Sequence, residues 1–433
     1  MAQIIPFRGI RYSPQIVADM SDVVAPPYDR VYPDVQQACL DRHPNNIVRI
    51  IKGRIEPSDT EADNVYTRAE AYLTSWLEQA VLIRDEAPAI YAYHQAYSFG
   101  GKTFTRKGII ALGRLEPERV HAHEKTLRGP KEDRLRLMQA TEANFGHIFM
   151  LYSDPQRVAD AAVAEAIQGE LPLIEAHDSD GNLHQVWAIT SADTIRAVQE
   201  ALASKELYIA DGHHRYETAV NYMRLCQQQG WTPSAPESFD SRMMTLFNID
   251  EPGMTIRPIH RLVHGVAPEM IQSFFDRAAQ QFAIIDVPTR DAALVALAEN
   301  RSKHAFGCFA GERWAVLALD EAADIASIVP GDASIEYKAL DVSILHAAVL
   351  DRLLGIDARA LEEQTHLTYT VDPAEGEARV REGSEQLLIL LNATTPEQVR
   401  SVADLGEKMP QKSTDFYPKL LTGLVLSKMG IQR

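Results

Sequence analysis

Residues 207–219 read L-Y-I-A-D-G-H-H-R-Y-E-T-A. The apolar run at the start of this stretch predicts a buried strand, and the Asp-Gly pair that follows predicts a sharp turn. Apolar residues then recur at helical spacing from Tyr216 to Met223, so a helix follows the turn directly. A strand that runs into a helix N-terminus gathers free backbone N–H groups at one point, and such a point binds anions.

The side chains of this motif have the chemistry of a phosphate site. Gly212 lets the backbone approach a ligand closely, and Arg215 can hold two phosphate oxygens at once. His213 or His214 can neutralise or protonate an oxygen as negative charge builds on it. The structural alternative is that the histidines cap the helix or pair with Glu217. Two adjacent histidines and an arginine directly after Asp-Gly favour the phosphate site.

A second stretch is positively charged within an acidic chain. Residues 121–144 read H-A-H-E-K-T-L-R-G-P-K-E-D-R-L-R-L-M-Q-A-T-E-A-N, and the Gly-Pro pair predicts a helix entry. Between positions 124 and 136 the basic residues outnumber the acidic ones; they are Lys125, Arg128, Lys131, Arg134 and Arg136. We expect Arg128, Lys131 and Arg134 to supply positive charge to bound phosphates. A solvent-exposed helix face with intrahelical ion pairs is the alternative.

Two carboxylates are candidates for the base that accepts a proton from an attacking hydroxyl. Glu124 lies within the positive stretch, and Asp29 follows the two prolines of residues 23–30, V-V-A-P-P-Y-D-R. Prolines cannot continue a central strand, so they predict a rigid loop that presents Tyr28 and Asp29 to a ligand. The structural alternative is that Asp29 caps the next segment.

Metal binding is a rival chemistry. We expect Mg²⁺ to bridge phosphate oxygens, with Asp211 and Glu217 as candidate ligands. A zinc site could also combine His121 and His123 with one of the motif histidines, but H-E-x-x-H spacing is absent. The chain also lacks G-x-S-x-G, G-x-G-x-x-G and G-x-x-x-x-G-K-[ST], so hydrolase, Rossmann and P-loop sites are unsupported.

The order of strand and helix patterns predicts an α/β or mixed α+β fold, with the motif strand in the centre of its sheet. Residues 89–115 have the alternation of a hairpin that turns at a Gly-Gly pair. The pattern of elements changes after Gly265. We therefore predict a nucleotide- or phosphate-binding catalytic domain over residues 1–265. Residues 266–433 are predicted to form a second α/β domain, whose role the sequence does not define.

The charge and composition of the chain limit its partners. The chain has 433 residues and a formal net charge of −17, which works against non-specific binding to nucleic acid or to an anionic membrane. Its three cysteines are too few for a disulfide framework. No signal-peptide core and no apolar run of about 18 residues are evident. We expect a cytoplasmic protein without nucleic-acid or membrane partners, and a homo-oligomer is compatible with the sequence.

Four ordered segments resemble the domain-of-unknown-function 1015 family. They are A-P-P-Y-D at 25–29, R-G-P-K-E-D-R-L at 128–135, the His-His-Arg motif, and M-P-Q-K-S-T-D-F-Y-P-K at 409–419. The segment A-D-G-H-H-R-Y-E-T-A is also similar to the Gly-x-His-Arg segment of the ParB-like/sulfiredoxin superfamily. This resemblance implies a ParB/sulfiredoxin-like core that holds nucleotide phosphates. Lys412 and its neighbours either close over the nucleotide or form an ordinary surface turn.

The superfamily resemblance implies three activities. Sulfiredoxin-like members use a cysteine where this chain has His213, and ParB-like members bind CTP and DNA, which the acidic charge disfavours. Free serine kinases, which use ADP or ATP, fit best. We therefore expect a nucleotide-dependent phosphotransferase that uses ATP or ADP with Mg²⁺ and acts on a small hydroxylated metabolite, with serine as one candidate. A nucleotide-binding regulatory protein with slow or no turnover and a metal-dependent phosphohydrolase are the alternatives.

Overall fold

The computed structural model describes residues 3–116, 120–121, 128–320, 322–363 and 365–433. The chain divides into two compact units. Unit 1 comprises Met1–Met254 and Pro418–Arg433, and unit 2 comprises Thr255–Tyr417. The division therefore falls before the expected boundary at residue 265, and the end of the chain belongs to unit 1 instead of a C-terminal domain.

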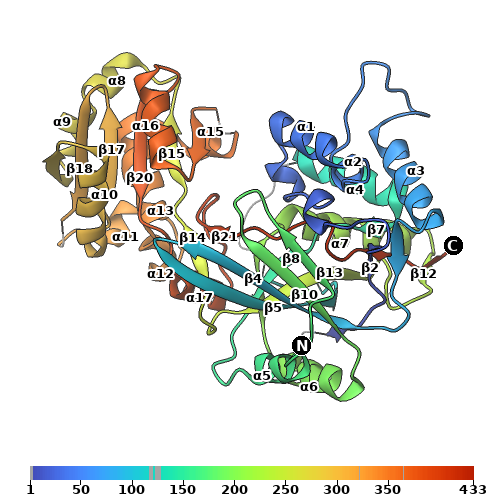
Figure 1. Ribbon diagram of the computed structural model, residues 1–433. Coiled ribbons are helices and arrows are strands. Elements are labelled where there is room, and N and C mark those ends of the chain that lie inside the picture. Colours follow the sequence, from blue (N-terminus) through green and yellow to red (C-terminus); the bar gives the residue numbers. More distant parts are fainter. Residues whose placement is uncertain (1–2, 117–119, 122–127, 321, 364) are drawn as a thin grey trace. The chain divides into compact units, whose positions relative to one another are not determined.

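Unit 1 is built on a large mixed sheet (Figure 1). Among the described residues its nine strands follow the order β6-β11-β8-β13-β5-β4-β10-β9, with β1 beside β5. Their bounds are β1 Ile4–Ile5, β4 Ile90–Phe99, β5 Lys102–Arg114, β6 Val120–His121, β8 Ile148–Tyr152, β9 Ile174–His177, β10 Leu183–Ile189, β11 Leu207–Asp211 and β13 Ser241–Asn248. The expected hairpin is confirmed: β4 and β5 are antiparallel and turn at Gly100 and Gly101, both at positive φ.

The motif strand β11 does not lie in the centre of the sheet. It is flanked by β8 on one side and by the two-residue terminal strand β6 on the other. The sequence expectation was wrong because a continuous apolar run indicates burial on both faces of a strand. It carries no information on the position of the strand across the sheet.

Three strand ends meet at one edge of this sheet. β11 is antiparallel to β8, with Asp211 opposite Phe149. β8 is parallel to β13, with Ile148 opposite Met244. The C-terminal end of β11 therefore lies beside the N-terminal ends of β8 and β13. This register brings the motif close to Arg242, although the two are separated along the chain.

Helices bury apolar side chains against the sheet. α5 (Val158–Ala166), α6 (Ala192–Ala203) and α7 (His213–Gln228) share one core with the strands, and Figure 1 shows α5 and α6 together against the sheet. α4 (Arg128–Thr141) packs against α7 and α3 (Val65–Glu78). α1 (Pro33–Arg42), α2 (Val48–Ile51) and α3 contribute to a second core with part of α4. Each fully buried aliphatic side chain in these cores contributes about 1.5–3 kcal/mol.

The last residues of the chain run back through unit 1. Thr422 exchanges backbone hydrogen bonds of 2.8 and 3.1 Å with Ala25, and Leu426 exchanges bonds of 2.7 and 2.8 Å with Ile10. β22 (Ser427–Lys428) then pairs with β7 (Ala143–Asn144). These contacts are made by backbone atoms with segments distant in sequence, so no local pattern signals them. They explain why residues 418–433 belong to unit 1.

Unit 2 contains an antiparallel sheet. Among the described residues its six strands follow the order β16-β18-β17-β20-β15-β19. Their bounds are β15 His260–Val263, β16 Phe282–Val287, β17 Phe306–Ala310, β18 Arg313–Leu319, β19 Leu367–Thr370 and β20 Leu387–Leu391. α10 (Arg290–Glu299) and α16 (Pro373–Arg381) bury residues in one apolar core. A second core includes the helical stretch of α13 (Asp341–Ile344), η4 (Leu345–Asp351) and α14 (Arg352–Leu354).

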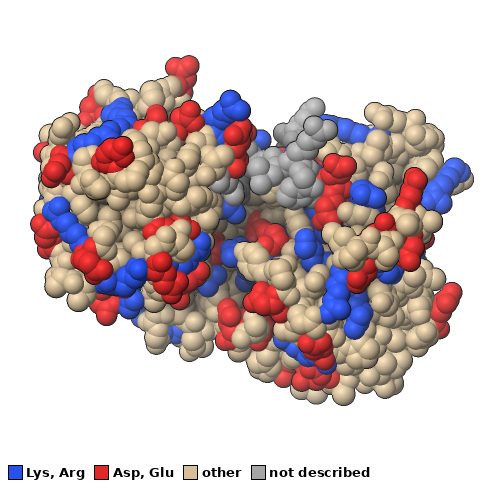
Figure 2. Space-filling view, turned by 90° about the horizontal axis from the view of Figure 1, so that it is seen from above, with Lys and Arg blue, Asp and Glu red and all other residues tan. Residues whose placement is uncertain are grey.

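The mixed α/β class expected from the sequence is therefore observed. β14 (Thr255–Arg257) and β21 (Asp415–Tyr417) pair where the chain enters and leaves unit 2. On the face drawn in Figure 2, acidic and basic side chains are interspersed over the coloured residues. Among the described helices, none is both long and apolar enough to span a bilayer.

Candidate anion-binding site

Gly212 sets the geometry of the motif. Its φ of +97° at the N-cap of α7 is a left-handed conformation that favours glycine. A Cβ atom at this position would lie 3.0 Å from Nη2 of Arg215. The turn after β11 therefore needs glycine for two reasons, its backbone conformation and the close approach of the Arg215 guanidinium.

Asp211 at the end of β11 is paired with two cations. Its Oδ2 atom lies 2.7 Å from Nζ of Lys419, and its Oδ1 atom lies 3.6 Å from Nη2 of Arg215. Burial opposes the ionisation of Asp211, but the charges of Lys419 and Arg215 outweigh it and hold the pKa of this carboxyl below its ordinary value. Asp211 is thus an ionised carboxylate that orients Arg215 from behind.

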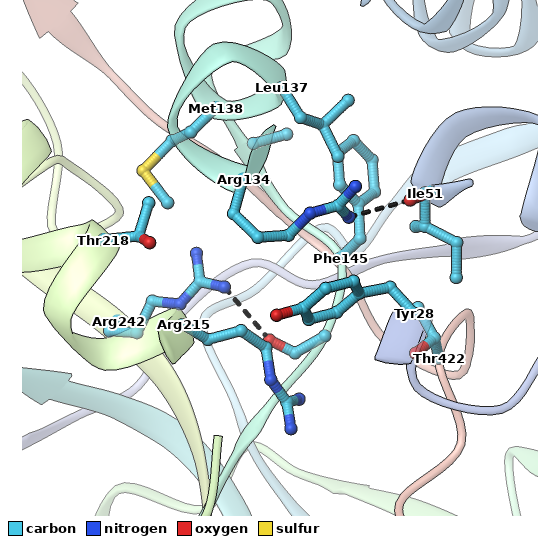
Figure 3. A pocket seen from close by; sticks show the side chains of 12 residues that line it. Tyr28, Ile51, Arg134, Leu137, Met138, Phe145, Arg215, Thr218, Arg242 and Thr422 are labelled. Atoms are coloured by element: carbon cyan, nitrogen blue, oxygen red, sulfur yellow. Dashed lines mark hydrogen bonds between the residues drawn. The ribbon is translucent and has the colours of Figure 1, made fainter. Parts of the chain in front are cut away.

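Three arginines from different elements line one small pocket in unit 1 (Figure 3). Arg134 comes from α4, Arg215 from the first turn of α7, and Arg242 from the start of β13. The pocket has a volume of about 40 Å³, its other walls are mainly apolar, and no acidic side chain of the described residues lines it. The arrangement is suited to a small anion, because guanidinium groups bind oxyanions with charge-assisted hydrogen bonds.

Arg242 is the least compensated of the three. Its side chain is buried, and its Nη2 atom donates to the carbonyl of Gly146 at 3.3 Å. Its Nε and Nη1 atoms are buried without a hydrogen-bond partner in the described part of the chain. Burial, with the charges of Arg215 and Arg134, lowers the pKa of Arg242 to about 9. An unpaired buried charge is costly, so this side chain favours the entry of an anion.

Arg134 and Arg215 are held by fixed neighbours. Arg134 donates from Nη1 to the carbonyl of Ile51 at 2.7 Å and from Nη2 to Asp133 at 2.6 Å. Arg215 donates from Nη1 to the carbonyl of His147. Their carboxylate partners Asp133 and Asp211 do not line the pocket. Both guanidinium groups are therefore oriented before any ligand binds, which lowers the entropy cost of binding.

Tyr28 adds a neutral hydrogen-bond donor. Its ring lies under the guanidinium of Arg134, with Cζ 4.3 Å from the ring centroid. Burial and the charge of Asp29 raise the pKa of Tyr28 to about 12, although Arg215 and Arg134 act in the opposite direction. The phenol therefore stays protonated at neutral pH. Figure 3 shows its hydroxyl and the guanidinium of Arg242 pointing toward each other across the pocket.

The comparison with protein families agrees with the motifs. A family model described as "Protein of unknown function (DUF1015)" matches residues 4–343. The chain belongs to this family. The matched part of this DUF1015 protein contains the first three motif segments, whereas residues 409–419 lie beyond it. No curated protein matches the chain.

Solved structures show only weak likeness to the DUF1015 chain. A conserved hypothetical protein from Pyrococcus furiosus is 14% identical, with 73% of this chain and 94% of that chain covered, at a TM-score of 0.36. A free serine kinase in complex with AMP is 14% identical, and the match covers 71% of this chain and 86% of that chain at a TM-score of 0.36. SbnI with a C-terminal truncation, from Staphylococcus aureus, is 10% identical, and the match covers 72% of this chain and 85% of that chain at a TM-score of 0.32. Such values transfer no activity, and the ParB-like/sulfiredoxin resemblance stays a prediction.

The other residues expected at the site of this DUF1015 protein lie outside the pocket. Lys131 and Glu217 form an ion pair of 3.0 Å that joins α4 to α7. His213 is buried and His214 half-buried in the first turn of α7, and neither lines the pocket. Asp29 is exposed in η2 (Tyr28–Arg30), directly after the pocket residue Tyr28.

Two predicted residues of the positive stretch fall where the side chains are not described. Glu124 lies outside the described residues. Arg128 is the first residue of α4, but its side chain also lies outside them. His123, which was considered as a zinc ligand, also lies outside the described residues. Among the basic residues of this stretch whose side chains are described, Arg134 lines the pocket and Lys131 does not.

The described residues offer no protein metal site. The candidate ligands Asp211 and Glu217 are each paired with a lysine, Lys419 and Lys131 respectively. Among the described residues, no group of three or more His, Cys, Asp and Glu side chains is arranged to hold a metal ion. A carboxylate that is neutralised by an ammonium group at hydrogen-bond distance is a poor cation ligand.

Sequence reasoning missed three residues that the structure brings to the site. Thr422 lines the pocket, Lys419 pairs with Asp211, and Arg242 contributes the unpaired guanidinium. Arg242 did leave a signal, since a lone arginine stands in the buried strand S-R-M-M-T-L-F-N. Lys419 ends the fourth family segment, but nothing in the sequence indicates its partner.

Buried polar contacts fix the position of Lys419. The Gln95 side chain donates from Nε2 to the carbonyl of Lys419 at 3.0 Å. Arg106, which is buried between two phenylalanine rings, donates to Oε1 of Gln95 at 2.9 Å and to the carbonyl of Pro418. The backbone of residues 418–419 is therefore anchored on the sheet, and the Lys419 side chain reaches Asp211 from a fixed point.

Proposed function

We propose that unit 1 is a nucleotide-dependent phosphotransferase that uses ATP or ADP to phosphorylate a small hydroxylated metabolite. The observation that carries this proposal is the pocket of Arg134, Arg215 and Arg242, whose described lining residues include no carboxylate. Phosphoryl transfer depends on positioning and on compensation of phosphate charge, and arginines perform both. The N-terminus of α7 behind Gly212 adds partial positive charge at the same end of the sheet.

The volume of the pocket decides which part of the nucleotide enters it. At about 40 Å³ the cavity has space for a phosphate group. Pockets that enclose whole drug-sized ligands measure roughly 300–1,000 Å³. The terminal phosphate of the nucleotide therefore enters between the arginines, and the nucleoside stays outside the pocket. In this arrangement Arg242 gains the partner that it lacks, and the Tyr28 hydroxyl donates a hydrogen bond to a phosphate oxygen.

Asp29 is the base in this proposal. It is exposed, it follows the pocket residue Tyr28 directly, and it has no hydrogen bond or ion pair among the described residues. The acceptor hydroxyl oxygen forms a bond to phosphorus while the bond to the leaving phosphate oxygen breaks, and Asp29 takes the hydroxyl proton. In this proposal His214, which is half-buried in the first turn of α7 and does not line the pocket, protonates or neutralises the leaving oxygen. Glu124 remains a second candidate base, and serine is one candidate acceptor.

A second function is favoured by one feature of the same pocket. The described residues of its lining include three guanidinium groups that can hold an anion, and none of these residues is a carboxylate or histidine that could act as a base. A nucleotide-binding regulatory protein with slow or no turnover needs only that part of the site. The two functions differ in acceptor-dependent turnover, so this property separates them.

The test is to incubate the full chain with ATP or ADP, Mg²⁺ and a panel of hydroxylated amino acids and hydroxy acids that includes serine. The products are followed by phosphorus NMR. We expect a new phosphate ester with one acceptor, and we expect Arg242→Met to abolish it. The matched control is Arg224→Met, which removes an exposed arginine from α7. Nucleotide binding without an ester under any acceptor would replace the phosphotransferase with the regulator.

The role of Asp29 is tested separately from binding. Asp29→Asn is expected to lower turnover by about 10²-fold or more, the usual contribution of a general base, with nucleotide affinity unchanged. Asp34→Asn, which removes an exposed carboxylate in the first turn of α1, is the control. Full turnover in Asp29→Asn would remove Asp29 from the mechanism and leave Glu124 as the remaining candidate.

A further inference from the structure

Unit 2 contains a buried guanidinium that has no carboxylate partner among the described residues. Arg261 on β15 is 0% exposed. It donates to the carbonyl of Ile259 from Nη1 and to the carbonyl of Lys412 from Nη2 at 3.0 Å. Its Nε atom is buried without a hydrogen-bond partner among the described residues. Arg261 thus satisfies the criterion that singles out Arg242 in unit 1, although it lies in a different unit and has different neighbours.

Lys412 brings a second positive charge to the same place. Nζ of Lys412 lies 5.7 Å from the ring centroid of Tyr369, and Cζ of Arg261 lies 5.2 Å from it. Two cations that share one aromatic ring repel each other, since no acidic side chain is paired with either of them among the described residues. The backbone of Lys412 has a φ of +58°, a left-handed conformation that is rare for lysine. Such strain persists only where surrounding contacts impose it.

The neighbouring histidines add no further positive charge to Arg261 and Lys412. Burial and the charge of Arg261 lower the pKa of His346 to about 3, and the same two causes lower the pKa of His260 to about 4. Both rings are therefore neutral at physiological pH. His346 belongs to η4, a π-helical stretch, and π-helical turns often occur at functional sites. Each neutral imidazole keeps one N–H group, which can donate a hydrogen bond to an anion.

Three residues around Arg261 are partly exposed. Lys412, Tyr369 and His346 are each half-buried, whereas Arg261 is buried. A small ion can therefore approach Lys412 from solvent. Arg261 and Lys412 both lie in unit 2, and the proposed phosphotransferase site of unit 1 uses neither of them.

We propose that Arg261 and Lys412 form an oxyanion-binding site in unit 2, which accepts a phosphate or carboxylate group. The anion supplies the missing acceptor for Nε of Arg261 and the counter-charge for both cations. This site is separate from the arginine pocket of unit 1 and does not depend on the proposed function of that unit. Its occupation also removes the repulsion between the two cations, so the anion stabilises the 410–413 backbone that Arg261 holds.

The first test observes Arg261 directly. The full chain is labelled with ¹⁵N-arginine, and inorganic phosphate or acetate is titrated while the Nε–H resonances are recorded. We expect one buried Nε–H resonance to shift saturably with at least one anion in Arg242→Met as well as in the wild type. In Lys412→Gly the affinity is expected to fall about tenfold or more. Glycine suits a φ of +58°, so this variant removes the ammonium group without straining the backbone.

The matched control is Lys408→Ser, which removes an exposed lysine from the adjacent stretch. It is expected to titrate as the wild type does. A second readout needs no resonance assignment: the rate of Lys412 acylation, followed by peptide mass spectrometry, is slowed by the bound anion, while that of Lys408 is not. If the titration with phosphate saturates, the site binds phosphate groups; if the titration with acetate saturates, it binds carboxylates. Identical titration of wild type and Lys412→Gly, or unprotected acylation with both anions, would overturn the proposal.

Discussion

Lys419 and Asp211, which are 208 positions apart in the sequence, form an ion pair with 2.7 Å between Nζ and Oδ2. The pair joins the segment that returns from unit 2 to the strand end that carries the motif. Asp211 in turn lies 3.6 Å from Arg215, so one carboxylate connects Lys419 with an arginine of the pocket. The end of the chain is therefore part of the anion-binding site, and its loss would remove both Lys419 and the pocket residue Thr422.

The first prediction concerns the turn before α7. Gly212→Ala is expected to destabilise the chain by more than about 1 kcal/mol, because alanine disfavours a φ of +97° and its Cβ atom displaces Arg215. It is also expected to abolish phosphate binding. Chemical denaturation gives the first quantity, and phosphate titration by calorimetry gives the second.

The control for this turn is Gly230→Ala. Gly230 has a φ of +75°, but a Cβ atom there meets no heavy atom within 4 Å. Its substitution therefore carries a similar backbone cost without any contact with Arg215. We expect Gly230→Ala to lose stability and to keep phosphate binding. Equal loss of binding in the two variants would show that backbone strain acts alone and would contradict a role for the Arg215 position.

Local patterns in the sequence were sufficient for some of this fold. The Gly-Gly turn between β4 and β5 and the mixed α/β class were predicted because each depends on residues close in the sequence. The position of β11 beside the edge and the return of residues 418–433 to unit 1 were not. Both depend on backbone pairing between distant segments, which leaves no periodicity in either segment.

The sequence was likewise sufficient to predict only part of the candidate site. The anion chemistry of Arg215 followed from residue types that lie together in the motif. Arg242 was missed because its importance depends on what surrounds it, namely burial next to two other guanidinium groups and no carboxylate. Lys131 was expected to bind phosphate, yet it pairs with Glu217. A sequence states the charge of a side chain, but only the fold shows whether that charge is already paired.

The second prediction uses the unpaired charge of Arg242. Arg242→Met removes a buried guanidinium that has no carboxylate partner among the described residues, and methionine is an apolar side chain that can fill much of the same space. Replacing a buried ion pair by apolar residues is often neutral or stabilising by about 1–4 kcal/mol, and an unpaired buried charge costs more than a paired one. In buffer without phosphate we therefore expect the melting temperature of Arg242→Met to equal or exceed that of the wild type.

The wild type and Arg242→Met should differ in how their melting temperatures respond to phosphate. The wild type is expected to melt at a higher temperature as phosphate is added, since a ligand that binds only the folded state stabilises it. Arg242→Met should lose most of this increase, and Arg224→Met should keep it. A variant that is strongly destabilised without phosphate would show instead that Arg242 serves the packing of β13.

The third prediction isolates the hydroxyl of Tyr28. Tyr28→Phe keeps the ring under the Arg134 guanidinium and removes the protonated donor. A hydrogen bond of this kind contributes about 0.5–1.5 kcal/mol, so we expect phosphate affinity to fall between about two- and tenfold. Stability should change little. Tyr32→Phe, at an exposed position, is the control. Unchanged affinity in Tyr28→Phe would place the bound phosphate away from this hydroxyl.

The last prediction concerns the pH dependence that Lys419 confers. The ordinary pKa of Asp211 is 3.8, and in the folded chain it is lower. A carboxyl whose pKa is lowered by folding stabilises the folded state above its ordinary pKa, and this contribution is lost as the pH falls through the folded value. Lys419→Met leaves burial, which raises the pKa, opposed by Arg215 and His213. We expect it to lower the free energy of unfolding at pH 7 by about 2 kcal/mol.

The difference between wild type and Lys419→Met should then shrink as the pH falls below about 4. Once Asp211 is protonated it carries no charge that Lys419 could stabilise. The ion pair then no longer stabilises the wild type, and the missing ammonium group no longer destabilises Lys419→Met. Urea denaturation at a series of pH values measures this difference. Lys102→Met, which removes an exposed lysine at the start of β5, should show no such trend. A difference between wild type and Lys419→Met that stays constant from neutral to acid pH would mean that Lys419 stabilises the chain by packing and not through the charge of Asp211.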